Sequence, residues 1–543
     1  MGEIPTVDFT SSGVEGRRKA PAGAFISAER NVDAKNPDTA KRNDLDRFRL
    51  RNFIEDLIDS GELEIRDDRV DLADLAAIMQ GNAKAVWFRN VGQEQMELVG
   101  NVLAGRNRLA RAFECEPRKV AVEMQKRLRN KPEFIECTQA TAPVQEVVLQ
   151  GTDADLTKLP VHLQHAADGA PYLAALDYVI DPATGMTNSG FRRLMLRSAH
   201  EAGVDLNAPS DLRAIYMAAS ARGEKLPVAF VIGSHPIDHV SATMRIPVDE
   251  LGLVSSLRGA PLPVVKCVTQ DIRVPADAEM VIEGYLDERG YSEKEGPYGE
   301  YLGYYGGVKM NPVFHVTAIT HRRNPLFMTT TISGNRMDLT DTSNLEALRC
   351  ELNVWEALKP VVREPQAVYA PVASGGSMSV RVSLKQRYPG EARTALYTIL
   401  GSVGVKNAFV VDPDIDIFSN EQMEWALGTR FQPDKDLIIV SGVRLSPLDP
   451  SLHGSPVGAK AGYDLTWPMQ YANKWELVTP TPPTYEGAKF PSLRAALEDG
   501  PKRFESLMAA LGSRDGREIV RELHTLRDKG LERDDEGRYF LKK

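Results

Sequence analysis

Apolar residues recur at helical spacing close to the start of the chain. Phe53, Ile54 and Leu57 fall on one face of a predicted helix, and Gly61 closes the run as a C-cap glycine does. Residues 1–44 lack this periodicity and are rich in Gly, Pro, Asp, Asn and Lys, so we predict a loosely ordered N-terminal arm there. The folded part of the protein is expected to begin near residue 45.

Residues 45–149 alternate between short helical and strand patterns. Residues 86–88 and 145–149 are apolar strand candidates, whereas 94–103 and 108–113 show helical spacing. This mixture predicts an N-terminal α/β section.

Short apolar runs separated by turn signals dominate residues 150–340. Asp181-Pro182 and Thr184-Gly185 are strong turn dipeptides between two strand patterns, which predicts a β-hairpin. Helical spacing interrupts the strands at 211–223 and 247–258. The predicted strands are 172–180, 186–195, 228–232, 264–268, 280–285, 313–320 and 326–331. Such a series of short strands indicates a β-rich domain, for example a small barrel.

The second half of the chain begins with one long helical pattern. A linker helix is expected within 341–360, with its N-cap region at Asp341 and Ser343. In 361–475, strand and helix patterns alternate at 378–384, 392–400, 407–411, 421–430 and 437–439, which predicts an α/β layer domain. Residues 476–543 open with a Pro-rich run and then show two amphipathic helical patterns, 492–511 and 518–529, so we predict a helical C-terminal appendage.

Composition narrows the class of protein. A chain of 543 residues predicts two or three domains, and its 42% hydrophobic and 26% charged residues are typical of a globular protein. The net charge of −9 argues against a nucleic-acid partner. Four widely spaced cysteines favour a reducing compartment, and no apolar run is long enough to span a membrane, so we expect a cytoplasmic protein.

Two histidines follow Pro160, at positions 162 and 165. A pair of histidines suggests a metal site, but in a loop pattern beside a proline they are more typical of a polar surface. We favour the surface interpretation for His162 and His165.

The stretch Glu295-Gly296-Pro297-Tyr298-Gly299-Glu300 is the strongest candidate for chemistry. Five residues of helix would set the two carboxylates roughly 140° apart and a strand would set them on opposite faces, so neither regular element brings them together. Pro297 and the glycines favour a bend that can aim both acids at one point. The alternative is a surface turn with solvated acids.

Several separated stretches resemble one family. The hexapeptide at 295–300, the Asn-x4-Arg motif of Asn188 and Arg193, and Leu257-Arg258-Gly259 after Glu250 together resemble the UbiD family of decarboxylases, over about residues 45 to 470. The resemblance implies a split-barrel flavin-binding domain that a long helix joins to an α/β oligomerisation domain.

The resemblance implies a catalytic set of Arg193, Glu295 and Glu300. Arg193 can hold a substrate carboxylate in a forked pair of hydrogen bonds, and Glu295 can orient that arginine. Glu300 is expected to lack a cationic partner, so a neighbouring carboxylate would raise its pKa and let it deliver a proton. The sequence leaves open whether Arg192 or Arg193 is the catalytic arginine, although the alternation of side chains along a strand points only one of them inward.

An aryl or vinyl carbanion needs an electron sink that no side chain supplies, and the resemblance implies prenylated FMN for that role. It further implies a divalent metal, Mn²⁺ or Mg²⁺, together with K⁺. The metal ligands implied are Asn188, His200 and Glu250, and the cofactor contacts implied are those three with Ser189, Arg192, Arg193 and Lys460. His200 follows Asn188 by only twelve residues, and the alternative is a polar loop histidine.

The predicted function is the reversible non-oxidative decarboxylation of an aromatic, heteroaromatic or α,β-unsaturated acid. The alternatives are a decarboxylase of an aromatic acyl-CoA of the phthaloyl-CoA type, a flavin-binding subunit without decarboxylation, and a non-catalytic subunit of a carboxylase complex. The resemblance implies a flavin prenyltransferase as the cofactor supplier and a homo-oligomer, either a dimer or a hexamer.

Overall fold

The computed structural model describes residues 44–402, 404–471 and 475–542. The predicted N-terminal arm therefore lies almost wholly outside the described residues. Residues 44–47 belong to a separate unit that holds one short 3-10 turn, η2 (Asp44–Asp46), and the chain from Phe48 onward forms the second unit.

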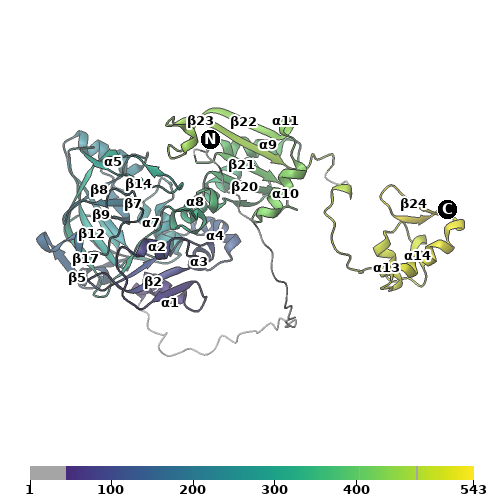
Figure 1. Ribbon diagram of the computed structural model, residues 1–543, viewed down its shortest axis with the longest axis horizontal. Coiled ribbons are helices and arrows are strands. Elements are labelled where there is room, and N and C mark those ends of the chain that lie inside the picture. The colour runs from purple at the N-terminus through teal and green to yellow at the C-terminus, as the bar shows by residue number, and fades with distance from the viewer. Residues whose placement is uncertain (1–43, 403, 472–474, 543) are drawn as a thin grey trace, which may run out of the picture. The chain divides into compact units, whose positions relative to one another are not determined.

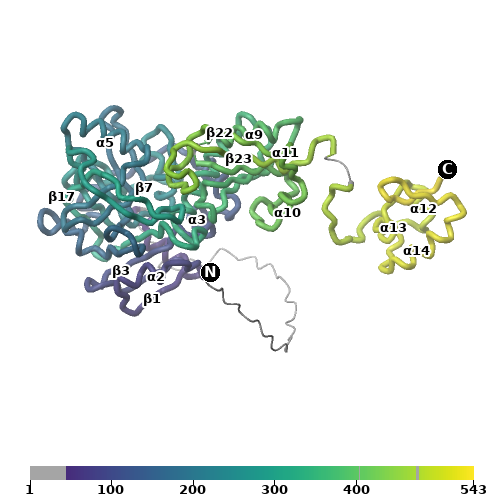
Figure 2. The backbone as a smooth tube through the Cα atoms, turned by 45° about the horizontal axis from the view of Figure 1, so that its top comes forward, coloured from purple at the N-terminus to yellow at the C-terminus, as the bar shows by residue number. Residues whose placement is uncertain are grey.

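The N-terminal section packs helices against a small mixed sheet (Figure 2). Its helices are α1 (Leu50–Asp56), α2 (Leu75–Met79), α3 (Arg106–Ala112) and α4 (Val120–Arg127). The sheet has the order β1 (Leu63–Arg66), β2 (Ala85–Val91), β3 (Met96–Gly100) and β18 (Leu326–Met328). The helix predicted at 94–103 is wrong, because this segment is strand β3: Leu98 and Val99 are fully buried, and β3 pairs with β2 on one side and β18 on the other.

A closed six-stranded barrel forms the centre of the chain (Figure 1). Its strands run β12 (Met280–Leu286), β9 (Leu226–Ile232), β6 (Tyr172–Ile180), β7 (Thr187–Leu196), β8 (Glu201–Val204) and β17 (Val313–His321). Pairing of β12 with both β9 and β17 closes the barrel, and β5 (Val147–Gln150) extends it beside β17. The predicted β-rich domain and its β6–β7 hairpin are confirmed.

Three helices accompany the barrel. They are α5 (Asp211–Ala221), α6 (Pro236–Ala242) and α7 (Glu250–Arg258). The side chain of Asp249 caps the start of α7, and Gly259 ends it in the left-handed conformation with φ +66°. A three-stranded sheet of β4 (Phe134–Cys137), β10 (Leu262–Lys266) and β11 (Arg273–Pro275) packs its apolar residues against α7 and the barrel.

Helix α8 (Asp341–Leu358) links the barrel region to the C-terminal domain, as predicted. Leu345, Leu348 and Leu352 belong to the hydrophobic core of the barrel region, whereas Val354 and Leu358 belong to the core of the C-terminal domain. The helix therefore joins two cores.

The C-terminal domain is an α/β layer, as predicted. Its sheet has the order β19 (Pro365–Tyr369), β20 (Ser379–Leu384), β21 (Asn407–Val411), β23 (Val457–Leu465) and β22 (Leu437–Arg444). Its helices are α9 (Glu391–Leu400), α10 (Asn420–Arg430) and α11 (Pro433–Asp436).

The appendage holds α12 (Leu493–Glu498), α13 (Phe504–Leu511), α14 (Gly516–Thr525) and a hairpin of β24 (Leu531–Arg533) and β25 (Tyr539–Leu541). Its hydrophobic cluster contains only residues of this segment. The single helix predicted at 492–511 is broken around Pro501, where the chain makes a β-bridge from Lys502 to Tyr539. The bridge at Lys502 and the β24–β25 hairpin add strand structure to this segment, which the predicted helical appendage did not include.

Candidate active site

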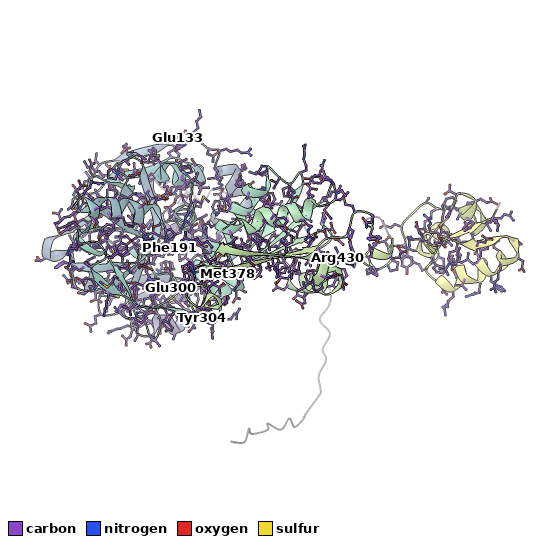
Figure 3. The ribbon with its side chains drawn as sticks, turned by 90° about the horizontal axis from the view of Figure 1, so that it is seen from above. Glu133, Phe191, Glu300, Tyr304, Met378 and Arg430 are labelled. Atoms are coloured by element: carbon purple, nitrogen blue, oxygen red, sulfur yellow. The ribbon has the colours of Figure 1, made fainter. Side chains whose placement is uncertain are left out.

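The hexapeptide lies in a bend, with both of its acids buried. Glu295 ends β13 (Glu293–Glu295), and after a cis peptide bond between Gly296 and Pro297 the chain enters β14 (Tyr298–Gly299). Glu295 is fully buried and Glu300, labelled in Figure 3, is 7% exposed. This burial excludes the surface-turn interpretation.

Arg193 on β7 meets both acids of the hexapeptide. Its Nε lies 3.2 Å from Glu295 Oε1, and its Nη1 lies 2.8 Å from Glu300 Oε2. The guanidinium carbon also lies 4.4 Å from the ring centre of Tyr298. The structure thus brings Arg193 to Glu295, which follows it by 102 residues in the chain, and to Glu300.

Arg192 points to the other face of β7. Its Nε lies 3.1 Å from Asp177 Oδ1, on the neighbouring strand β6. Successive residues of a strand face opposite sides, so only Arg193 reaches the hexapeptide. The alternation expected from the sequence resolves the choice between the two arginines.

Asp205 and Asn311 complete the surroundings of Arg193. Asp205 Oδ2 lies 2.8 Å from Arg193 Nη2, and the Asn311 amide donates a hydrogen bond of 3.0 Å to Glu295 Oε2. Neither residue belongs to a motif or a regular pattern, so sequence analysis missed both. Their contacts exist only because the segments after β8 and at β16 (Lys309–Asn311) fold beside β13.

Glu300 differs from the expectation in one respect, because it has a cationic partner in Arg193. Burial nevertheless raises the pKa of Glu300 above its usual range, and the lowering effect of Arg193 is smaller. The Oε1 atom of Glu300 is buried and accepts no hydrogen bond among the described residues. Glu300 is therefore suited to hold a proton close to a cation.

Gly306 in β15 (Tyr305–Gly306) allows the Glu300 side chain to lie where it does. A Cβ atom at position 306 would come within 2.6 Å of Glu300 Oε1. Only glycine fits this close approach without moving the carboxylate.

A second cluster lies at the other end of β7. The Glu250 carboxylate accepts a hydrogen bond from the Asn188 amide at 3.0 Å and a short one from the Ser189 backbone N–H. Burial raises the pKa of Glu250 to about 8. Asn188 Oδ1 and Ser189 Oγ are buried without a hydrogen-bond partner among the described residues, so this cluster offers unused oxygen ligands.

The structure does not bring His200 to this cluster. Asn188 lies near the start of β7 and His200 follows its end, so roughly 25 Å of strand separates them. The His200 Nδ1 atom lies 3.0 Å from the Ala154 carbonyl oxygen. Within the part of the chain that the structure describes, no three His, Cys, Asp or Glu side chains form a group that could hold a metal ion.

Lys460 makes its contacts inside the C-terminal domain. Its Nζ donates to the Leu400 carbonyl oxygen at 3.0 Å and to that of Ser402. Lys460 thus lies within the C-terminal domain, and its contact with a cofactor phosphate stays a prediction.

The two histidines after Pro160 do not form a metal pair. His162 is 3% exposed, so the surface interpretation is wrong for this residue. His165 Nδ1 lies 3.0 Å from Asp168 Oδ2, and its ring packs edge-on against Tyr298 at 5.7 Å. His165 therefore belongs to the surroundings of the hexapeptide, whereas His162 makes a β-bridge to Tyr172, whose ring packs against Tyr298.

Three consecutive family models match the chain. The N-terminal, Rift-related and C-terminal domains of 3-octaprenyl-4-hydroxybenzoate carboxy-lyase match residues 54–128, 136–336 and 344–465. The appendage lies beyond them. No helix among the described residues is long and apolar enough to cross a membrane.

Named relatives and solved structures agree with these models. The anhydromevalonate phosphate decarboxylase of Methanosarcina mazei is 29% identical, over 77% of this chain and 95% of its own. The UbiD-class enzyme HmfF of Pelotomaculum thermopropionicum, solved with FMN, is 30% identical with a TM-score of 0.75, over 80% of this chain and 98% of its own. The vanillic acid decarboxylase of Sedimentibacter hydroxybenzoicus is 28% identical with a TM-score of 0.73, over 80% and 96%.

The barrel, the α/β domain and these matches define a carboxy-lyase. The chain belongs to the UbiD family.

Proposed function

We propose that this protein catalyses the reversible, non-oxidative decarboxylation of an aromatic, heteroaromatic or α,β-unsaturated acid with prenylated FMN. The observation that carries the proposal is the buried arrangement of Arg193 between Glu295 and Glu300, in which burial raises the pKa of Glu300. In a solvent-exposed ion pair, the carboxyl group would not favour its protonated form and the arginine would not be held in place. The combination of the two is typical of a functional site.

Arg193 is the proposed carboxylate-binding group. Glu295 and Asp205 hold its Nε and Nη2 atoms, so protonation of Glu300 weakens only the contact at Nη1. The Nη1 donors then become available to a substrate carboxylate, while the guanidinium stays oriented.

Glu300 is the proposed proton donor. Prenylated FMN, when bound, supplies the electron sink for the carbon that loses CO₂. Glu300 then delivers its proton to that carbon, and in the reverse direction it removes the proton. Arg193 stabilises the resulting Glu300 carboxylate until it is protonated again.

The Glu250 cluster is the proposed site for the cofactor phosphate and its metal. Asn188 Oδ1, Ser189 Oγ and the Glu250 carboxylate are oxygen donors of the kind that Mn²⁺ or Mg²⁺ prefers, with K⁺ as a second cation, and Arg192 adds a positive charge nearby. Asp211 at the start of α5 is close enough for its charge to raise the pKa of Glu250. We therefore propose Asp211, and not His200, as the additional ligand.

The metal assignment is tested by binding Mn²⁺ to purified protein, followed by electron paramagnetic resonance. We expect Glu250→Gln and Asp211→Asn to weaken Mn²⁺ binding at least tenfold. His200→Ala is the matched variant and should bind as the wild type does. Weak binding by His200→Ala with normal binding by Asp211→Asn would reverse the assignment.

The proposed activity is tested with protein produced together with a flavin prenyltransferase. Absorbance and mass spectra should show a bound prenylated flavin, and a panel of aryl and acrylic acids should release CO₂ or exchange deuterium at the product carbon. Protein that binds no flavin when Mn²⁺ and K⁺ are present would contradict the cofactor. A flavin-loaded protein that acts on no acid would favour the flavin-binding alternative.

The names of the relatives do not identify the acid that is the substrate of this protein. Their names include vanillic acid and anhydromevalonate phosphate, which differ in ring, charge and size. An evolved form of one UbiD-class neighbour is dimeric. We propose that this chain also forms a homo-oligomer, a dimer or a hexamer, and that it works in the cytoplasm. Light scattering of the purified protein would test the oligomeric state.

A further inference from the structure

A segment of turns and bends runs along the second half of the hexapeptide. It consists of residues 164–169, which precede strand β6 and which we call the strap. The strap makes a direct hydrogen bond to each of three consecutive hexapeptide residues. These bonds run from the Gly169 N–H to the Pro297 carbonyl oxygen at 2.8 Å, from the Tyr298 hydroxyl to Gln164 Oε1 at 2.5 Å, and from the Gly299 N–H to Asp168 Oδ1 at 2.9 Å.

The Asp168 carboxylate is the central group of the strap. Its side chain is fully buried, at 0% exposed. Its Oδ1 atom accepts the Gly299 N–H, while its Oδ2 atom accepts the His165 backbone N–H at 2.9 Å and lies 3.0 Å from His165 Nδ1. Hydrogen bonds from a backbone N–H to a carboxylate are stronger than those between neutral groups. One buried carboxylate therefore ties the strap to the residue that immediately precedes Glu300.

Two glycines allow the strap and the hexapeptide to approach each other closely. A Cβ atom at Gly169 would come within 2.4 Å of the Gly296 carbonyl oxygen, and a Cβ atom at Gly299 would come within 2.5 Å of His165 Nδ1. The two segments are thus in direct contact on both sides of Pro297. A displacement of the strap displaces this part of the hexapeptide with it.

Strand pairing alone gives the second half of the hexapeptide little support. Strand β14 pairs with β15 over two residue pairs, and among the described residues it pairs with no other strand. A two-stranded hairpin is at best marginally stable by itself. Glu295 differs, because β13 pairs with β16 and the Asn311 amide bonds to the Glu295 carboxylate. The strap therefore supports the backbone before Glu300 where the sheet does not.

We propose that the strap positions the proton donor Glu300, and that Asp168 is a positioning residue of the reaction. This inference rests on the proposed decarboxylation and deepens it. Arg193 keeps its own contacts with Glu295 and Asp205, which do not involve the strap. The strap therefore governs the delivery of the proton, whereas Arg193 governs the binding of the substrate carboxylate.

Asp168→Asn is the first test variant. An amide keeps only one acceptor oxygen, so either orientation of it sets an NH₂ group against the N–H of Gly299 or that of His165. We expect the loosened Glu300 carboxyl group to gain contact with water, and its pKa to fall toward the usual range. Gly169→Ala forces the same segments apart and leaves the carboxylate in place, so it gives the same test if Asp168→Asn fails to fold.

Infrared difference spectroscopy of the full-length holoenzyme measures this effect without a substrate. Loss of a protonated carboxyl band in Glu300→Gln identifies the band of Glu300. Its titration midpoint should lie about one pH unit lower in both strap variants than in the wild type. Asp534→Asn is the matched control, since that carboxylate also accepts two backbone N–H groups but lies in the appendage, and it should leave the midpoint unchanged. An unchanged midpoint in the strap variants, with only a lower melting temperature, would overturn the proposal.

Kinetics with cinnamate as the probe acid give a second readout. In both strap variants kcat for CO₂ release should fall about tenfold to a hundredfold, and KM should change little because Arg193 is undisturbed. A raised KM with unchanged kcat would show that the strap acts on acid binding instead, which contradicts the proposal. A holoenzyme that shows the infrared shift but converts no aryl or acrylic acid would contradict the decarboxylase proposal and leave the positioning of Glu300 by the strap standing.

Discussion

Glu300 Oε2 lies 2.8 Å from Arg193 Nη1, and burial nonetheless keeps the pKa of Glu300 above its usual range. Desolvation of the carboxylate thus outweighs one close cation, because Glu295 and Asp205 share the charge of that cation. The proposed chemistry depends on this balance.

Replacing Glu300 with Gln should abolish proton delivery and keep the fold. General acid catalysis contributes about 10²–10⁴-fold, so we expect CO₂ release by Glu300→Gln to fall at least a hundredfold with flavin still bound. Glu288→Gln, at an exposed position, is the matched control and should retain wild-type turnover. Full turnover by Glu300→Gln would refute the assigned role.

The pH dependence follows from the sign of the Glu300 shift. The pKa of this carboxyl group is raised, so its proton-donating form is present at low pH and is lost as pH rises through the raised value. We expect kcat for decarboxylation to fall along that alkaline limb. The residual rate of Glu300→Gln should lack this limb, and a limb that persists would assign it to another group.

Asp205 should act as a positioning residue that tunes Glu300. Its negative charge raises the pKa of Glu300, and it also occupies Nη2 of Arg193. Asp205→Asn should therefore move the alkaline limb of kcat to lower pH, which a purely structural role would not do. An unchanged limb together with a lower melting temperature would indicate structure alone.

Gly306→Ala should displace the Glu300 carboxylate, since the new Cβ would lie within 2.6 Å of Oε1. Misplacing a reacting group by about 1 Å can cost on the order of a hundredfold, and we expect a loss of that order in kcat. Gly307→Ala is the matched control, because a Cβ there meets nothing within 4 Å. Equal rates for the two variants would contradict the close approach.

The appendage should unfold separately when its own core is damaged. Leu523 on α14 is 6% exposed within the cluster of that segment, and Leu523→Ala should cost about 2–5 kcal/mol. Val520 on the same helix is 56% exposed, so Val520→Ala should change stability by at most about 0.5 kcal/mol. Hydrogen exchange should show lost protection in residues 485–541 only for Leu523→Ala. Lost protection across the barrel would show that the segment is not independent.

Local sequence determined the elements whose signals are short-range. The turn at Asp181–Gly185 set the β6–β7 hairpin, and the apolar face with Asp249 and Gly259 set the extent of α7. The spacing of apolar residues alone was insufficient to predict β3. Residues 96–100 of this strand pair with β2 on one side and β18 on the other, and a local stretch of sequence does not contain all three strands.

The sequence by itself determined which residue types carry the chemistry: the acids of the hexapeptide and the arginine of β7, each recognisable from a motif. Only the tertiary structure decided their environment. It placed Asp205 beside Arg193 and Asn311 beside Glu295, it set His200 beyond the far end of β7, and it buried His162. The reason is physical, because burial and charge pairing are sums over neighbours distant in the chain, and these sums set the pKa of Glu300.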